Sequence, residues 1–203
     1  MTLPQDVDPE SRCRLPLPKR AELDALGQQI FDRVTDPKGG TIRGLKGPSG
    51  IQLHSPGLSQ HAGPLNRYLR YQAGFSGRVR ELAILVTARE CDSQFEWAAH
   101  EPEALRQGIA PALIDVVRHR KDMAGLDEAD KTIIALGREM FGARKVAPET
   151  FRRALAQFGR RGLVDLVSLM ANYAGTAALL CAFDMQLDEG TTAILPVPSI
   201  IRR

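Results

Sequence analysis

Residues 78–101 have the sequence Arg-Val-Arg-Glu-Leu-Ala-Ile-Leu-Val-Thr-Ala-Arg-Glu-Cys-Asp-Ser-Gln-Phe-Glu-Trp-Ala-Ala-His-Glu. In the first half of this segment, apolar residues recur at the spacing of one helix face: Val79, Leu82, Ala83 and Val86. That spacing predicts an amphipathic helix that packs against a core. We take this helix as the element around which the rest of the chain is arranged.

The second half of the segment carries polar side chains at helical spacing. Ser93, Glu96 and His100 follow one another at intervals of three and four residues. If the helix continues, these side chains lie on one face, flanked by the apolar rings of Phe95 and Trp97. A carboxyl group and an imidazole one turn apart, next to aromatic rings, can form an acid/base pair with shifted pKa values. The alternative is a surface ion pair, which contributes about 0.3–0.5 kcal/mol to stability.

Together with Glu81, these residues stand at the spacing of a known motif, in which an upstream Glu is followed by Cys-x-x-Cys-x-x-x-His. Here Ser93 and Glu96 occupy the two Cys positions, and His100 occupies the His position. On these residues the chain resembles the carboxymuconolactone decarboxylase family, and the resemblance extends from about Leu53 to about Asp184. It implies an all-α, multi-helix, alkylhydroperoxidase-D-like fold and an oligomer, usually a trimer or a multiple of one.

The resemblance also implies a catalytic group. Glu96 is expected to donate or accept a proton with His100 as its partner, and Glu81 is expected to orient His100 by accepting its second ring proton. Such a pair in an apolar pocket can both protonate and deprotonate carbon. The expected function is a cofactor-free lyase or decarboxylase that acts on a small carboxylated or lactone-like substrate. The sequence does not choose among decarboxylation, isomerisation and related lyase steps.

Two other functions stay open. A thiol peroxidase like the alkylhydroperoxidase branch needs a resolving thiol beside the attacking one, and both motif cysteines are absent here. Cys91 stands between Glu90 and Asp92 in the expected helix, without the positive neighbour that stabilises a thiolate, so a buried and inert Cys is expected. The other alternative is a non-catalytic helical oligomer.

Five further residues are candidates for substrate binding: His54, Arg43, Ser93, Trp97 and Tyr173. His54 lies in a Leu-His-Ser-Pro segment that often approaches the pocket in the family that the chain resembles, although a loop or capping histidine fits as well. Arg43 is a candidate for binding a substrate carboxylate, since a guanidinium binds a carboxylate bidentately. The alternative is a solvated side chain, as for most loop arginines. Tyr173 is polar within an apolar helix, so it either has a buried partner or lines the pocket.

Composition limits the partners and the compartment. The formal net charge is +3 and the basic residues are scattered, so nucleic-acid binding is not expected. Three distant cysteines indicate a reducing compartment, and the first residues contain no secretory signal, so a cytoplasmic location is expected. The sequence has neither the ligand spacing of a metal site nor a Gly-rich phosphate loop after a strand. No metal and no cofactor is therefore expected.

Helical spacing continues through most of the chain without a βαβ pattern, which predicts an all-α multi-helix bundle. Residues 1–18 are expected to form an irregular arm, residues 19–34 a helix and the Gly-rich residues 36–50 a loop, so that residues 1–50 precede a helical domain at 51–203. A helix is expected to begin at Pro56 and to bend or split at Pro64. Later helices are expected to begin near residues 102, 111, 127, 148 and 163.

The helix expected over residues 163–183 is apolar on nearly all sides. Its length raises the question of a membrane span. Polar residues interrupt it at Asp165, Ser168, Asn172 and Thr176. No membrane partner is therefore expected, and a buried core helix is the first interpretation. Small residues such as Ala171 and Gly175 also permit the close approach of a second subunit, so a homo-oligomer is expected.

Overall fold

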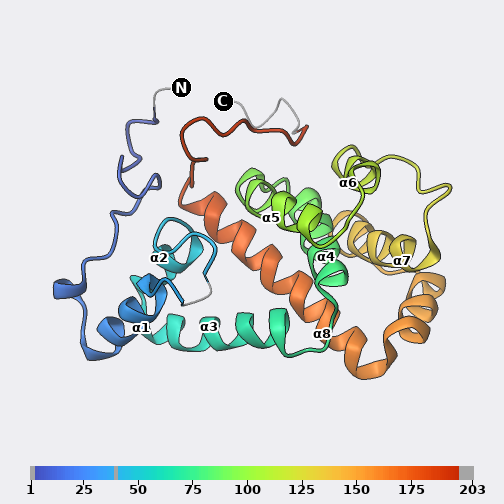
Figure 1. Cartoon of the computed structure of the whole chain (residues 1–203), viewed down its shortest axis with the longest axis horizontal. Helices are drawn as coiled ribbons and strands as arrows, with labels where there is room; N and C mark the ends of the chain where they lie inside the picture. Colours follow the sequence, from blue (N-terminus) through green and yellow to red (C-terminus); the bar gives the residue numbers. More distant parts are fainter. Residues whose placement is uncertain (1–2, 39–40, 197–203) are drawn as a thin grey trace.

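The computed structural model describes residues 3–38 and 41–196, and all regular secondary structure within them is helical, which confirms the expected all-α class. Figure 1 shows the helices: a short 3₁₀ turn η1 (Arg20–Glu22), α1 (Ala25–Thr35), α2 (Pro48–Leu53), α3 (Pro56–Tyr71), α4 (Gly77–Glu90), α5 (Gln94–Arg106), α6 (Pro111–Arg118), α7 (Glu128–Gly137), a π-helical turn η2 (Arg138–Ala143) and α8 (Pro148–Ala182).

Helix α4 is the central element of the core. Every residue from Arg80 to Arg89 is buried, and the helix packs against α5, α6, α7 and α8. Ser76 begins it, because the Ser76 hydroxyl accepts a hydrogen bond from the amide of Val79 and so satisfies a free N–H group at the helix start. A helix buried on all sides must find partners inside the protein for any charged side chain it carries. Glu81 is such a side chain.

Helix α8 connects the two halves of the molecule. In the view of Figure 1 it runs diagonally, with α1, α2 and α3 on one side and α4 to α7 on the other. The N-terminal arm packs on the segment that follows α8: the amide of Arg14 donates to the carbonyl of Phe183, and the amide of Gln186 donates to the carbonyl of Arg12, both at 2.8 Å. The arm therefore contacts its own chain.

The helix expected to continue to His100 is interrupted between α4 and α5. Asp92 has a left-handed backbone conformation, with a φ of 51°, and Ser93 is the N-cap of α5. The Ser93 hydroxyl accepts a hydrogen bond from the amide of Glu96 at 3.4 Å. This break lets α5 pack against α4, so that Glu81 and His100 meet from two neighbouring helices.

Two prolines lie inside continuous helices, although the sequence predicts helix breaks at both. Helix α3 runs through Pro64, and α5 runs through Pro102. Both residues are exposed, so water can bond the carbonyl group that each proline leaves free. The split expected at Pro64 and the separate helix expected to begin near Pro102 are therefore wrong, and a bend at Pro64 stays a prediction.

The longest helix, α8, contains one break. Gly159 has a φ of 66° and a ψ of 178°, so the helices expected from Pro148 and from Leu163 are two arms joined at this residue. Glycine adopts this conformation without the steric penalty of a Cβ. Helix α8 is long and apolar enough to cross a membrane, and a core helix of a soluble protein meets the same criteria. Length and composition alone do not distinguish the two.

Gly137 at the end of α7 marks a close approach of three helices. A Cβ there would lie 2.3 Å from Val86 Cγ1 on α4 and 2.8 Å from Met170 Cε on α8. We predict that Gly137→Ala lowers the free energy of unfolding by about 1–3 kcal/mol in urea denaturation, the usual cost of overpacking. Gly142→Ala is the matched control, because a Cβ at Gly142 meets nothing within 4 Å. Equal stability of the two variants would contradict this packing.

Candidate active site

A buried carboxylate on α4 is the anchor of the site. Glu81 has no exposed surface. Its Oε1 accepts a hydrogen bond from Arg80 Nε at 2.9 Å, and its Oε2 lies 2.7 Å from His100 Nδ1 on α5. Arg70 on α3 adds a second cation, with a guanidinium nitrogen 3.9 Å from Oε1. These partners compensate for the loss of water around the carboxylate. The predicted contact between Glu81 and His100 is confirmed.

This contact fixes the ring of His100. Because Glu81 accepts at Oε2, Nδ1 carries the proton and donates it to the hydrogen bond. The other ring nitrogen, Nε2, lies 3.8 Å from Glu96 Oε2, which is too long for a hydrogen bond. Tyr173 on α8 packs edge-on against the imidazole, with ring centroids 5.1 Å apart and planes at 86°. His100 is thus held on two sides and presents Nε2 toward Glu96.

The two carboxyl groups beside His100 have opposite pKa shifts. Burial acts to raise the pKa of Glu81, but the hydrogen bond from His100 and the two neighbouring arginines outweigh it, and the pKa falls below its usual range. Burial also raises the pKa of Glu96, and there the neighbouring cations offset only part of the effect. The surroundings therefore favour the ionised form of Glu81 and the neutral form of Glu96, on either side of one imidazole.

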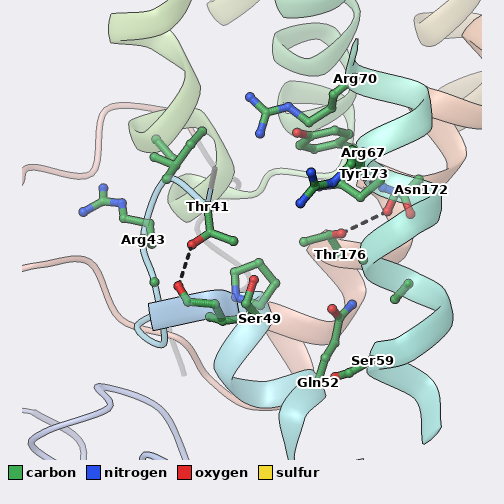
Figure 2. A pocket seen from close by; sticks show the side chains of 18 of the residues that line it. Thr41, Arg43, Ser49, Gln52, Ser59, Arg67, Arg70, Asn172, Tyr173 and Thr176 are labelled. Carbon is green, nitrogen blue, oxygen red and sulfur yellow. Dashed lines mark hydrogen bonds between the residues drawn. The ribbon is translucent and has the colours of Figure 1, made fainter. Parts of the chain in front are cut away.

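Glu96 and His100 open onto a cavity of about 500 Å³ enclosed by α1, α2, α3, α5, α8 and the loop that follows α1. Figure 2 shows the view into it. Its uncharged polar lining includes Thr41, Ser49, Gln52, Ser59, Asn66, Tyr71, Asn172, Tyr173 and Thr176. Burial raises the pKa of Tyr173, so its hydroxyl keeps its proton and is available as a donor. The size and the lining suit a small polar ligand.

The charged groups of the cavity are nearly all positive. Five cations line it: Arg33, Lys38, Arg43, Arg67 and Arg70. Within the described part of the chain, Glu96 is the one carboxyl group in this lining. Five cations outnumber one carboxyl group whether or not Glu96 is ionised, so the charged side chains of this lining sum to a positive charge, which favours an anionic ligand.

Arg70 is a residue of the site that the sequence analysis misses. Its side chain is only 7% exposed, and its Nε has no hydrogen-bond partner among the described residues. Figure 2 shows it at the same end of the cavity as Tyr173. A buried N–H group without a partner is costly, and an oxygen atom of a ligand would remove that cost. Its burial comes from the packing of α3 on α8, which no local sequence pattern reveals.

Two of the predicted substrate-binding residues line the cavity. Tyr173 does so beside His100. Arg43 also lies in the lining, but its guanidinium pairs with Asp188 and covers the ring of Phe95, 5.5 Å from the ring centroid. A substrate carboxylate would therefore have to compete with Asp188 for Arg43.

The other three predicted residues lie outside the cavity lining. Ser93 is used as the N-cap of α5. Trp97 follows Glu96 directly and so points to another side of the helix, where it is fully buried and donates to Glu101 at 2.9 Å. His54 is exposed, and its Nε2 lies 2.9 Å from the carbonyl oxygen of Pro16. Each of the three has a structural partner.

Cys91 is expected to be buried in mid-helix, but it is only half-buried and is the C-cap of α4. It lies outside the cavity lining. Burial raises the pKa of its thiol, which disfavours the reactive thiolate. Across residues 3–38 and 41–196, no three or more His, Cys, Asp or Glu side chains are grouped to hold a metal ion.

Comparisons with family models, with curated proteins and with solved structures found no match to this chain. The relation to carboxymuconolactone decarboxylases therefore stays a resemblance carried by the spacing of Glu81, Glu96 and His100. The functional argument depends on the geometry of these three side chains and of the cavity beside them.

We predict that Glu96 makes the protein less stable as the pH rises. Its raised pKa means that the folded state binds this proton more tightly than the unfolded chain, where the ordinary value is 4.5. Stability is therefore lost as the pH rises from that ordinary value through the folded pKa. Glu96→Gln removes this dependence, so its advantage in melting temperature over the wild type should grow from about pH 4 to about pH 8. A constant difference over this range would contradict a neutral Glu96.

Proposed function

We propose that this protein is a cofactor-free enzyme of the lyase or decarboxylase type, which transfers a proton at a carbon atom of a small carboxylated or lactone-like substrate. The observation that supports this most directly is the pair of buried carboxyl groups with opposite pKa shifts beside His100. Titratable groups whose pKa values are shifted in opposite directions by their surroundings are typical acid and base partners. The resemblance to carboxymuconolactone decarboxylases supports the same reaction class.

In this proposal His100 is the base and Glu96 is the acid. Glu81 holds the Nδ1 proton, which leaves a free lone pair on Nε2. A substrate beside both Nε2 and Glu96 Oε2, which are 3.8 Å apart, can lose a proton to His100 at one carbon and gain one from Glu96 at another. In a decarboxylation, the bond to the carboxylate breaks, CO₂ leaves and the electron pair passes into a conjugated carbonyl group. Glu96 then protonates the carbon and is itself reprotonated from solvent.

Arg70 and Glu81 stabilise the charges that these steps create. Negative charge develops on the substrate oxygen, and the buried guanidinium of Arg70, whose Nε has no hydrogen-bond partner among the described residues, can stabilise it. Positive charge develops on His100 when it takes a proton, and the ionised Glu81 at 2.7 Å stabilises it. Both effects are stronger in a buried site than in water.

The two alternative functions have weaker support. A thiol peroxidase needs a reactive thiolate in the cavity, whereas Cys91 lies outside the cavity lining and has a raised pKa. A non-catalytic helical oligomer would be marked by an exposed Glu96 without a cavity, whereas Glu96 is 4% exposed and lines one. A cytoplasmic location stays a prediction.

We predict that Glu96→Gln lowers turnover by about 100-fold or more, because the amide keeps the shape of the side chain but cannot release a proton. His100→Ala should have a similar effect, and the double variant should be scarcely slower than either single variant, since the effects of mutating groups that act as a unit are not additive.

Small carboxylates and lactones would first be screened for conversion by NMR, with the exposed Glu149→Gln as the control. Full activity of Glu96→Gln would end this mechanism. A double variant whose loss equals the product of the single losses would show that the two residues act separately.

We further propose that the chain forms a homo-oligomer through α8. Several apolar or small residues of this helix are exposed at intervals of seven, four and three: Val164, Ala171, Gly175 and Ala178. Such spacing places them on one face, and Val164 alone is 65% exposed. A second copy of the chain would remove this face from water. The family resemblance suggests a trimer or a multiple of one.

Analytical ultracentrifugation at micromolar concentration should therefore show an oligomer. Gly175→Glu should shift the protein to the monomer, because a Cβ at Gly175 meets nothing within 4 Å in the single chain, while the glutamate would place a charge in the interface. Gly142→Glu has equally open surroundings and should leave the oligomer intact. A wild-type protein that sediments only as a monomer would count against this proposal.

A further inference from the structure

Three cations of the cavity lie apart from the proposed proton-transfer group: Arg33 of α1, Lys38 of the loop after it and Arg67 of α3. We call these three residues the outer cluster. All three are exposed, whereas Arg70, three residues after Arg67 on α3, is buried beside Glu81. The cavity therefore has an outer positive end and an inner end that contains the acid/base group.

Two members of the outer cluster converge from different helices. A guanidinium nitrogen of Arg33 lies 3.5 Å from the position that a Cβ would have at Gly63. Gly63 and Arg67 are four residues apart on α3 and so share one face of the helix. Because Gly63 has no side chain, Arg33 can reach this face from α1. In Figure 2, the side chain of Arg67 extends from α3 into the cavity. Arg33 and Arg67 thus both face the cavity, where an anion would be attracted by both charges.

The described residues do not neutralise the outer cluster. Arg33, Lys38 and Arg67 form no ion pair and no side-chain hydrogen bond with residues 3–38 or 41–196. The nearby acids are engaged elsewhere: Asp32 pairs with Arg20 at 2.7 Å, and Asp36 accepts a hydrogen bond from the backbone amide of Lys38 at 2.8 Å. The charge of the cluster is available to a ligand.

We propose that the outer cluster binds a phosphoryl group, so that the substrate of this enzyme carries a phosphate a few bonds from its reacting carbon. Guanidinium groups bind phosphate oxygens through paired hydrogen bonds, and a lysine adds a point charge. Three cations match a dianionic phosphate better than a carboxylate, which carries one charge. This inference rests on the proposed function only for the reaction at the inner end of the cavity. Phosphate binding by the outer cluster does not depend on that reaction.

The distance between the two ends limits the substrate. Side chains three residues apart on a helix have Cβ atoms about 5–6 Å apart, so Arg67 and Arg70 can hold two groups of one small molecule. Arg70 would bind the oxygen of the reacting group, and the outer cluster would bind the phosphate. This division gives a ligand group to the partnerless Nε of Arg70 and to the cations of the outer cluster.

Binding of inorganic phosphate, measured by isothermal titration calorimetry at constant ionic strength, tests the proposal without a known substrate. The wild type should bind phosphate at one site, and acetate should bind at least about tenfold more weakly, as the difference in charge requires. Arg67→Gln and Arg33→Gln should each weaken phosphate binding by about tenfold, the effect of removing one charged hydrogen-bonding group. Because both side chains are exposed, the melting temperatures of these variants should match that of the wild type.

Two further variants serve as controls. The first tests for a general effect of positive charge, and the second separates phosphate binding from proton transfer. Arg160→Gln removes the same charge from an exposed position about 18 Å along α8 from Asn172, and phosphate binding should not change. Glu96→Gln should still bind phosphate even where it has lost turnover, so that failure of the phosphate site and failure of the proton-transfer proposal give different results.

Four results would overturn the proposal. These are the absence of phosphate binding, equal affinity for acetate and phosphate, an equal loss in Arg160→Gln, and a loss in Arg70→Gln without one in Arg67→Gln. The last result would place the anion at the inner end of the cavity, and the third would show a general effect of charge.

Discussion

The hydrogen bond between Glu81 and His100 joins α4 to α5 at the centre of the protein, and the candidate site depends on it. Glu81 has no contact with water, so its charge is tolerated only because His100 and the arginines compensate it. Removing one partner of such a buried pair costs about 3–5 kcal/mol. The same bond fixes the tautomer of His100 and directs Nε2 toward Glu96. One interaction therefore stabilises the fold and prepares the imidazole for proton transfer.

The contrast between Glu81 and Glu96 follows from their neighbours rather than from the residue type. Glu81 receives short hydrogen bonds from Arg80 and His100, which favour its ionised form. Glu96 lies in the first turn of α5, where the helix dipole favours an anion by about 0.3–1 kcal/mol. That is less than the several kcal/mol by which burial without a close partner disfavours a charge, so the neutral form prevails. The fold thus shifts the pKa values of two glutamates in opposite directions on either side of one imidazole.

Local sequence spacing was sufficient to predict the helical class, because helical periodicity depends on residues close together in the chain. The contact between Glu81 and His100, which are 19 residues apart on two helices, was expected from the family resemblance. It was not sufficient for the break at Asp92, since the left-handed conformation of a non-glycine residue leaves little trace in sequence. Burial of Arg70 and the ion pair of Arg43 with a carboxylate 145 residues later depend on long-range packing, which spacing does not report. The cationic lining of the cavity was missed for the same reason.

The central claim is that the fold lowers the pKa of Glu81 and raises the pKa of Glu96 from their common ordinary value. The most direct test is a ¹³C NMR titration of the labelled glutamate side-chain carboxyl carbons, with the two signals assigned from Glu81→Gln and Glu96→Gln. The account predicts that Glu81 titrates below the ordinary value of 4.5 and Glu96 above it. Titration of both groups near 4.5, or in the reverse order, would contradict it.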